Sequence, residues 1–393
     1  MQTKIATALA EGSVEEVALQ LTKEIKGSLG EQAPVLLLVF ASTAQPLDEL
    51  MPKLSGSFPG AVLLSASTAG EFTEKRDAKS STAIFALAGD YRIFSGMGRN
   101  LKANVEGAVA EAVEGLPKEV EGYPYRTALL MLDPLSGNGE EATLIVSYSL
   151  GEDVRLAGGT AGDDLKMKQT WVGLGDQVAS DSMVLGLIFS KAPLGVGVCH
   201  GHRPISAPLK ITRAQGNVVS EVNGEPAWTV WERETRAAAK RADIDSTQLT
   251  PEQMGGYLLR YEAGLSTGAD YKIRAPLAKN DDGSLVFACG IPEGAEVQIT
   301  ESIPERQIES AREAARRARA QTGDAPIAGA LVFDCICRNL ILNKDFQRAV
   351  DSISQELGNV PLAGFETYGE IALDVGDMSG FHNTTTVVLA FPK

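Results

Sequence analysis

The sequence has 393 residues, of which 44% are hydrophobic and 22% are charged, a balance typical of globular proteins and a length that suggests two or three domains. Aromatic residues make up only 6%, whereas the 40 glycines indicate many tight turns and close approaches of the backbone. The formal net charge of −15 repels phosphate backbones, so the composition argues against a nucleic-acid-binding protein.

Cysteine usage and hydropathy point to an intracellular protein. Four cysteines are too few for a disulfide scaffold in a chain of this size, and they fit a reducing compartment. The sequence offers neither a credible signal peptide nor an apolar run of about 18 residues. We therefore expect a cytoplasmic protein without membrane insertion that passes any signal to a separate partner.

Three segments share one pattern, which consists of an apolar run, an amphipathic stretch, a second apolar run and a Thr-x-Gly-acid motif. They extend from Val35 to Glu71, from Ala128 to Asp163 and from Ala330 to Glu370. The first two have nearly the same length, and the third is longer by about one helical turn. Another apolar run follows each motif, so each repeat is predicted to be strand, helix, strand, loop and strand.

The predicted arrangement places all three motifs at a sheet edge that commonly binds ligands. Two strands joined by a helix should be parallel with a right-handed crossover. Each motif then lies just past the carboxyl end of the second strand, where open α/β sheets bind ligands. The structural alternative is a set of tight turns preserved by duplication. The motif residues predicted to bind a ligand are Ser67, Thr68, Gly70 and Glu71; Gly159, Thr160, Gly162 and Asp163; and Thr367, Tyr368, Gly369 and Glu370.

A proline-rich segment over residues 191–210 predicts a domain boundary. An N-terminal domain, residues 1–195, would hold two repeats, and a C-terminal domain, residues 210–393, would hold the third. Alternating strand patterns between Tyr271 and Glu301 predict an antiparallel meander, and Glu305 to Gln321 predicts a helix. The expected fold class is α/β, with repeated βαβ-β units in largely parallel mixed sheets, two domains, and the meander in the second.

Several short motifs, in this order along the chain, resemble those of the FIST sensory proteins, which have a FIST N-terminal and a FIST C-terminal domain. They are S-T-A-G-E from Ser67, G-G-T-A-G-D-D from Gly158, V-N-G-E-P-A from Val222, I-R-A-P-L from Ile273, Cys337-Arg338, G-F-E-T-Y-G-E from Gly364 and F-H-N-T-T from Phe381. The resemblance extends from about residue 35 to the C-terminus. The first motif departs from it, because Ala66 stands where many relatives are expected to have Cys.

This resemblance implies a non-enzymatic input module that reports a small-molecule ligand to a histidine kinase or another signalling protein. It adds Arg274, Arg338 and Asn383 to the predicted ligand-binding residues. One expectation is an amino-acid-like ligand, whose ammonium would meet Glu71 or Asp163 and whose carboxylate would meet Arg274 or glycine amides. The other is haem b, since stand-alone family members include haem proteins that sense nitric oxide.

A haem group needs an axial ligand, usually His, Cys or Tyr. The chain has three histidines, His200, His202 and His382, and these are the predicted cofactor-binding residues. On one strand His200 and His202 would point to the same face, but this pair lacks the further ligands of a closed zinc site. A purely structural role is the alternative for each histidine.

Enzymatic functions find less support in the residues. The motif threonines have no base nearby in the sequence to activate them as nucleophiles. Glu71, Asp163 and Glu370 would bind Mg²⁺ or Ca²⁺ only if the three loops converge, which leaves a metal-dependent enzyme as the least favoured alternative. Neither a phosphate-binding loop nor a dinucleotide fingerprint occurs. We expect a sensor rather than an enzyme.

Overall fold

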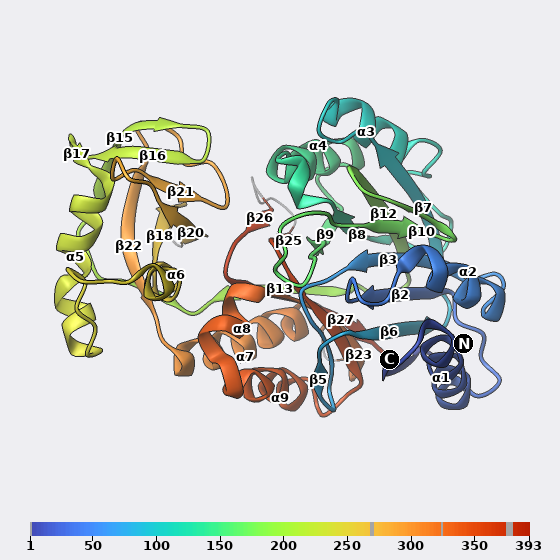
Figure 1. The fold of residues 1–393 in the computed structure, drawn as a ribbon. Coiled ribbons are helices and arrows are strands. Elements are labelled where there is room, and N and C mark those ends of the chain that lie inside the picture. The colour runs from blue at the N-terminus through green and yellow to red at the C-terminus, as the bar shows by residue number, and fades with distance from the viewer. Residues whose placement is uncertain (1, 268–270, 324, 375–379) are drawn as a thin grey trace.

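The computed structural model describes residues 2–267, 271–323, 325–374 and 380–393, which form two separate masses (Figure 1). The larger mass, called the repeat body, comprises residues 2–200 and 304–393 and holds all three repeats. The smaller mass, called the inserted lobe, comprises residues 202–302 and lies on the left of Figure 1, coloured from yellow-green to light orange. The third repeat therefore lies with the first two in space, although the lobe separates it from them in sequence.

Each repeat contributes four strands, in the same order, to one of three six-stranded sheets. The first sheet is β1 (Lys4–Glu11), β6 (Ser81–Ala88), β2 (Leu36–Ala41) and β3 (Val62–Ser67). The second is β7 (Arg92–Arg99), β12 (Ser182–Ser190), β8 (Tyr125–Leu132) and β9 (Arg155–Thr160). The third is β13 (Gly195–His200), β27 (Thr385–Pro392), β23 (Ile327–Cys335) and β24 (Leu362–Thr367). Only the two strands joined by the crossover helices are parallel: β2 with β3, β8 with β9 and β23 with β24.

The repeats exchange short hairpins in a closed ring. The hairpins are β4 (Glu71–Thr73) with β5 (Asp77–Ala78), β10 (Val172–Leu174) with β11 (Gln177–Ala179), and β25 (Glu370–Leu373) with β26 (Phe381–His382). The hairpin of the first repeat joins the third sheet, through β4 and β24. The hairpin of the second repeat joins the first sheet, where β10 pairs with β3. The hairpin of the third repeat joins the second sheet, where β25 pairs with β9. The three repeats are thus related by an approximate threefold arrangement.

Helices cover the outer face of each sheet, and the inner faces share one core. The helices are α1 (Val14–Leu29) and α2 (Leu47–Ser57) on the first sheet, α3 (Val105–Val113) and α4 (Gly139–Leu150) on the second, and α7 (Pro304–Gln321), α8 (Ile336–Leu342) and α9 (Phe346–Glu356) on the third. The six residues of β2 are all buried because alternate side chains face two cores. Leu38 and Phe40 belong to the shared core, where Phe40 meets the rings of Phe333 and Phe365, whereas Leu37 packs under α1 and α2.

Glycine pairs on two outer strands allow helices to pack directly on the backbone. A Cβ atom on Gly96 or Gly98 of β7 would lie within 2.0 Å of a carbonyl oxygen of α3. Gly195 and Gly197 of β13 stand in the same relation to α7, where a Cβ would lie within 1.9 Å of a carbonyl oxygen. Such distances exclude any side chain, so the Gly195/Gly197 pair serves helix packing.

The inserted lobe contains antiparallel strands and two helices. Its elements are β14 (His202–Pro204), β15 (Leu209–Gln215), β16 (Val218–Val222), β17 (Glu225–Pro226), α5 (Ala227–Arg241), α6 (Pro251–Arg260), β18 (Tyr261–Ser266), β19 (Tyr271–Arg274), β20 (Pro276–Lys279), β21 (Leu285–Phe287) and β22 (Glu296–Ser302). The predicted antiparallel pairing is confirmed, but the strands are not in simple meander order. Within the predicted meander only β20 and β21 pair as chain neighbours, because β22 crosses to pair with β14, β15 and β18.

The mixed α/β class predicted from the sequence is confirmed, with parallel pairing confined to one strand pair in each sheet of the repeat body. The predicted helix from Glu305 to Gln321 corresponds to α7, Pro304–Gln321. Across the described ranges, every helix is too short or too polar to cross a membrane.

Candidate functional site

The three motif loops converge at the centre of the ring, and the backbone of each copy is bonded to both others. Gly162 N donates to Ser67 O at 2.8 Å, which joins the second copy to the first. Thr160 N donates to Gly369 O at 2.8 Å, which joins the second copy to the third. Ala69 N donates to Glu366 O at 3.1 Å and closes the ring between the first and third copies. The loops therefore form one assembly, as a shared site requires.

The motif glycines are needed because the loops lie so close together. A Cβ atom on Gly162 would lie 2.6 Å from Ala69 N, in the backbone of the first copy. On Gly159 it would lie 2.5 Å from Cγ2 of Thr367, and on Gly70 it would lie 2.6 Å from Oε2 of Glu366. All three distances are far below ordinary contact, so the glycines serve the approach of one loop to another.

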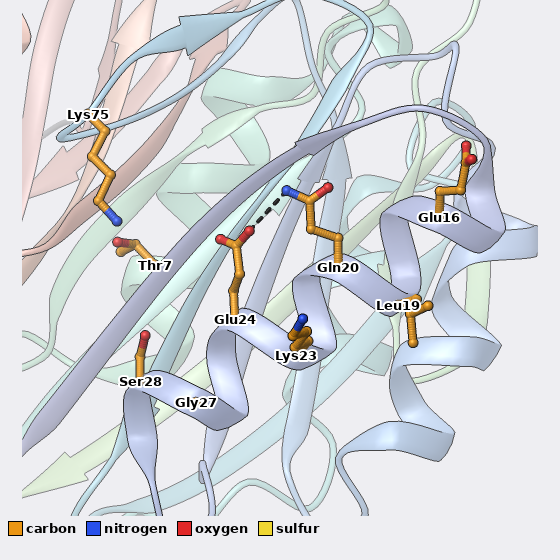
Figure 2. Close-up of a pocket in the computed structure, with 9 residues that line it drawn as sticks. All are labelled: Thr7, Glu16, Leu19, Gln20, Lys23, Glu24, Gly27, Ser28 and Lys75. Atoms are coloured by element: carbon orange, nitrogen blue, oxygen red, sulfur yellow. Dashed lines mark hydrogen bonds between the residues drawn. The ribbon is translucent and has the colours of Figure 1, made fainter.

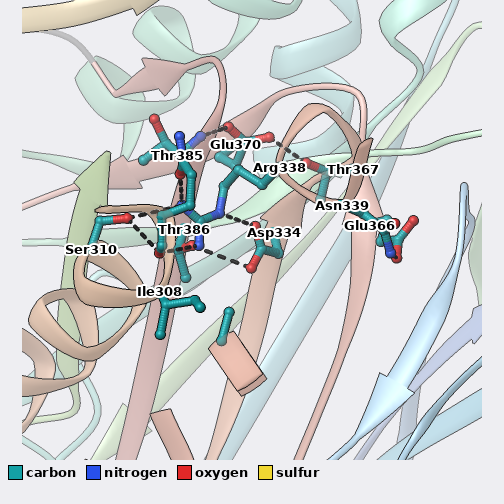
Figure 3. Close-up of polar contacts among 12 residues, drawn as sticks. Ile308, Ser310, Asp334, Arg338, Asn339, Glu366, Thr367, Glu370, Thr385 and Thr386 are labelled. Atoms are coloured by element: carbon teal, nitrogen blue, oxygen red, sulfur yellow. Dashed lines mark hydrogen bonds and ion pairs between the residues drawn. The ribbon is translucent and has the colours of Figure 1, made fainter. Parts of the chain in front are cut away.

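In the first and third copies the motif threonine donates a hydrogen bond to the motif acid. Thr68 Oγ1 donates to Glu71 Oε1, and Thr367 Oγ1 donates to Glu370 Oε1 at 2.5 Å (Figure 3). Both acids are buried. Burial raises the pKa of Glu71 to about 8 and raises the pKa of Glu370 well above its usual range. Both carboxyl groups are thus satisfied within their own repeats.

The second copy differs, because its acid turns toward the following loop. Asp163 accepts hydrogen bonds from the backbone N–H groups of Met167 at 2.8 Å and Lys168 at 2.6 Å. It also accepts one from the hydroxyl of Tyr368 at 2.6 Å. Although burial opposes ionisation, these bonds hold the pKa of Asp163 below its usual range. The hydroxyl of Thr160, buried in the core, has no hydrogen-bond partner within the described ranges.

Convergence of the loops does not gather their carboxylates. Glu71, Asp163 and Glu370 each bond to different groups, and none of the three bonds to another. In the part of the chain that the structure describes, no cluster of three His, Cys, Asp or Glu side chains is placed to hold a metal ion. The alternative of a metal-dependent enzyme built on the motif acids therefore lacks the geometry on which it depended.

A small hollow lies where the second repeat, the inserted lobe and the third motif meet. We call it the junction hollow, and its volume is about 120 Å³. Its walls include Gly137, Glu140, Cys289, Gly290, Tyr368 and Phe381. The ring of Phe381 lies where a Cβ on Gly139 or Gly369 would stand, so both glycines make room for it. The site is thus assembled from segments that are distant in the sequence.

Opposite charges face each other beside this hollow. Arg274, which is only 2% exposed, places Nη2 at 2.5 Å from Oε1 of Glu140, whose side chain is 41% exposed. Asn383 Nδ2 donates to Cys289 Sγ at 3.6 Å. Burial raises the pKa of Cys289 to about 11, so its thiol is neutral. Within the described residues, Nε of Arg274 and Oδ1 of Asn383 are buried without a hydrogen-bond partner, which leaves capacity for a polar ligand.

The predicted ligand-binding residues fall into three groups. Tyr368 lines the junction hollow, Arg274 and Asn383 contact its lining residues, and Asp163 is linked to it through Tyr368. Ser67 lines a different hollow in the first repeat. The other motif residues hold the loops together: Thr68, Gly70, Glu71, Gly159, Thr160, Gly162, Thr367, Gly369 and Glu370.

Arg338 was predicted to bind ligand, but its side chain is fully buried beside the third sheet. It lies 2.5 Å from Asp334 and donates to Ser310 Oγ at 2.9 Å (Figure 3). It also donates to the side chain and the carbonyl oxygen of Gln307. These bonds connect α7 and α8 to β23, and Arg338 lines none of the hollows described in this section.

The histidines lie in surroundings that do not form a haem pocket. Nε2 of His382 lies 3.1 Å from the carbonyl oxygen of Ala372, and burial lowers the pKa of His382 to about 3. His200 ends β13 and His202 begins β14, so the same-face geometry expected for two histidines on one strand does not apply to them. Both line a hollow of about 250 Å³ whose other walls include Arg203, Arg306 and Glu309. These polar walls do not fit the flat apolar face of a macrocycle.

A larger hollow, about 640 Å³, is a groove along the outer face of α1 (Figure 2). Glu16, Lys23, Glu24 and Lys75 give it a charged lining, and Leu19 at its edge is 72% exposed. None of the motif residues lines this groove. Its size alone therefore does not make it the better candidate.

Sequence reasoning missed Glu140 and Cys289. Glu140 is the second residue of α4, and Asp48 is likewise the second residue of α2. An acid at the same place in two crossover helices was a signal that repeat alignment could have found. Cys289 carried no such signal, because it reaches the hollow through the folding of the lobe.

Family comparison agrees with this architecture. A FIST N domain matches residues 35–225, and a FIST C domain matches residues 233–373. The chain therefore belongs to the FIST family, whose domains are sensor domains that bind small ligands. The first match ends at residue 225 and the second begins at residue 233.

Two relatives found by sequence carry the name uncharacterized protein. Protein MJ1623 of Methanocaldococcus jannaschii is 20% identical over 360 residues, which cover 88% of this chain and 68% of that protein. Protein Rv0628c of Mycobacterium tuberculosis is 28% identical over 219 residues, and the chain spans only 55% of that relative. Among solved structures, a cyanuric acid hydrolase from A. caulinodans aligns over 100% of this chain at 9% identity, with a TM-score of 0.28, too low to support any conclusion.

Proposed function

We propose that this FIST protein is a sensor that binds a small zwitterionic metabolite, such as an amino acid, in the junction hollow. The observation that carries this proposal is the pair of opposite charges, Arg274 and Glu140, at the edge of a hollow where three parts of the chain meet. A few precisely placed polar groups are enough to orient a ligand in such a site. The hollow, at about 120 Å³, is smaller than most ligand pockets, so the proposal requires a small ligand or a shift of the lobe away from the repeat body.

The charges suggest how such a ligand would be oriented. Its carboxylate would accept hydrogen bonds from the guanidinium of Arg274, which has a nitrogen to spare. Its ammonium would lie against the half-exposed carboxylate of Glu140. The sequence suggested Glu71 or Asp163 for the ammonium, but Glu140 is the better partner because it lines the junction hollow and those two acids do not.

The position of the hollow suggests how binding would be reported. Arg274 belongs to the inserted lobe and Glu140 to the repeat body, so a ligand that enters between them changes a contact across the boundary. A ligand can shift the equilibrium between two positions of the lobe only if it binds one of these two states more tightly than the other. We infer that a separate signalling protein, such as a histidine kinase, would read the resulting position of the lobe.

A thermal-shift screen of the standard amino acids tests the proposal, with Glu140→Gln as the variant and the neighbouring exposed Glu141→Gln as the matched control. We expect at least one amino acid to raise the Tm of the wild type and of Glu141→Gln but not of Glu140→Gln. The proposal fails if no amino acid shifts the Tm, or if both variants lose the shift equally.

Haem-based sensing of nitric oxide remains an alternative prediction for which the surroundings of His200, His202 and His382 give no support. The protein would be mixed with hemin and its absorbance spectrum recorded. A Soret band that shifts with nitric oxide and disappears in His382→Ala would favour this alternative over the amino-acid sensor.

A further inference from the structure

A second hollow lies in the first repeat at the place that corresponds to the junction hollow. It has a volume of about 310 Å³, within the range of small-molecule sites. One wall is the start of α2, including Gln45 and Asp48, and the other is the segment around β10 and β11, including Trp171 and Val178. We call it the first-repeat hollow.

The two hollows correspond element by element. The junction hollow lies between the start of α4 and the hairpin that the third repeat donates to the second sheet. The first-repeat hollow lies between the start of α2 and the hairpin that the second repeat donates to the first sheet. Asp48 and Glu140 occupy the same place, the second residue of the crossover helix. The duplication has thus produced two hollows, each with an acid on its wall.

The hollows differ in how that acid is neutralised. Glu140 pairs with Arg274 of the inserted lobe, whereas the lobe contributes no residue to the lining of the first-repeat hollow. Over the described ranges, Asp48 has no ion-pair partner. The first-repeat hollow is therefore larger than the junction hollow, and its acid, Asp48, lacks a cation such as the Arg274 that pairs with Glu140.

A buried acceptor makes this hollow a built site. Gln45 is only 3% exposed, and its side-chain amide donates to Gly12 O at 2.8 Å and to Ser80 O at 3.2 Å. These two bonds fix the orientation of the amide, and Oε1 is left without a partner in the described part of the chain. Leaving a buried acceptor unpaired costs about 1–3 kcal/mol, so a donor-bearing ligand would be stabilised here.

We propose that the first-repeat hollow binds a small organic cation, an alkylguanidinium or alkylammonium. The cationic head donates to Gln45 Oε1 and is attracted by Asp48, while the indole of Trp171 adds a cation–π contact and Val178 packs against the alkyl chain. The cation takes the place that Arg274 occupies beside Glu140. This site does not depend on the proposed function of the junction hollow.

Titration with n-propylguanidinium, followed by calorimetry and by tryptophan fluorescence, tests the proposal. We expect saturable binding at one site, with no binding of propionate or 1-propanol. Asp48→Asn should weaken binding by about twofold to fivefold, because one exposed charge is lost. Glu49→Gln is the matched control, since it removes the adjacent first-turn acid that does not line the hollow, and it should leave binding unchanged.

A variant of Gln45 and a variant of the junction hollow show whether the cation binds in the first-repeat hollow or elsewhere. Gln45→Met should also weaken binding, and circular dichroism with the Tm would show whether that variant is folded. Absence of saturable binding, or equal affinity in Asp48→Asn and wild type, would overturn the proposal. Weakening by Glu140→Gln without weakening by Asp48→Asn would place the cation in the junction hollow and would also overturn it.

Discussion

Replacing Gly162 with alanine tests whether the motif loops pack as closely as the structure places them. The added Cβ would lie 2.6 Å from Ala69 N and 2.8 Å from the carbonyl carbon of Thr68, against 3.4–4 Å for ordinary contact. Both neighbours are backbone atoms, so relief requires one loop to move. Gly162 does not have a positive φ, so the clash between loops is the reason to expect an effect.

Overpacking of this kind costs about 1–3 kcal/mol. Unfolding entropy of about 2.1 cal/mol/K per residue gives roughly 0.8 kcal/mol/K for the whole chain, so the Tm should fall by about 1–4 °C. Calorimetry at one protein concentration would measure it. Gly27→Ala is the control, because Gly27 lies in α1 and a Cβ atom added there would have nothing within 4 Å, so alanine should stabilise by up to about 1 kcal/mol. Equal Tm values for Gly162→Ala and wild type would refute the reasoning.

Three further predictions concern buried polar groups. The pKa of Glu71 is raised to about 8 in the folded protein, so the folded state holds a proton that the unfolded state releases above its ordinary pKa of 4.5. The contribution of protonated Glu71 to the free energy of unfolding is therefore fully present below pH 4.5 and is lost as pH rises through 8. The loss is up to about 1.4 kcal/mol per pH unit. Glu71→Gln should flatten the denaturation midpoint against pH in this window, and an unchanged slope would contradict the assignment. Arg338→Leu should leave Asp334 unpaired in the core and lower the free energy of unfolding by about 3–5 kcal/mol in urea titrations, whereas an unchanged midpoint would mean that the pair is not structural. Tyr368→Phe removes a hydrogen-bond donor that lowers the pKa of Asp163, so it should lower the free energy of unfolding by about 1–2 kcal/mol at pH 7. This loss of stability should shrink as pH falls through the folded pKa of Asp163. A loss of stability that does not depend on pH would count against this role.

Much of the fold was predictable because each repeat shows its strands and helices in the local pattern of apolar residues. The apolar runs, the crossover helices and the parallel pairs follow from periodicity within each repeat. Exchange of hairpins between repeats was not predictable, since it depends on pairings such as β4 with β24 that join residues far apart in the sequence. The convergence of the loops follows from that exchange.

The candidate site was predictable only in part. Tyr368 lines the junction hollow, Arg274 and Asn383 contact residues that line it, and all three stand in motifs that the sequence singled out. The motif pattern could not show that Asp163 would turn to backbone amides while Glu71 stays with its threonine, because the difference lies in the loop that follows each motif. Repetition of a motif therefore predicted shared architecture better than shared chemistry.

The most direct test of the proposed sensor is a crystal structure of the protein with the amino acid that gives the largest shift in the thermal screen. The account predicts ligand density in the junction hollow, with the ammonium within hydrogen-bond distance of Glu140 and the carboxylate facing Arg274. Density in the groove along α1 or in the first-repeat hollow, with the junction hollow unchanged, would contradict it.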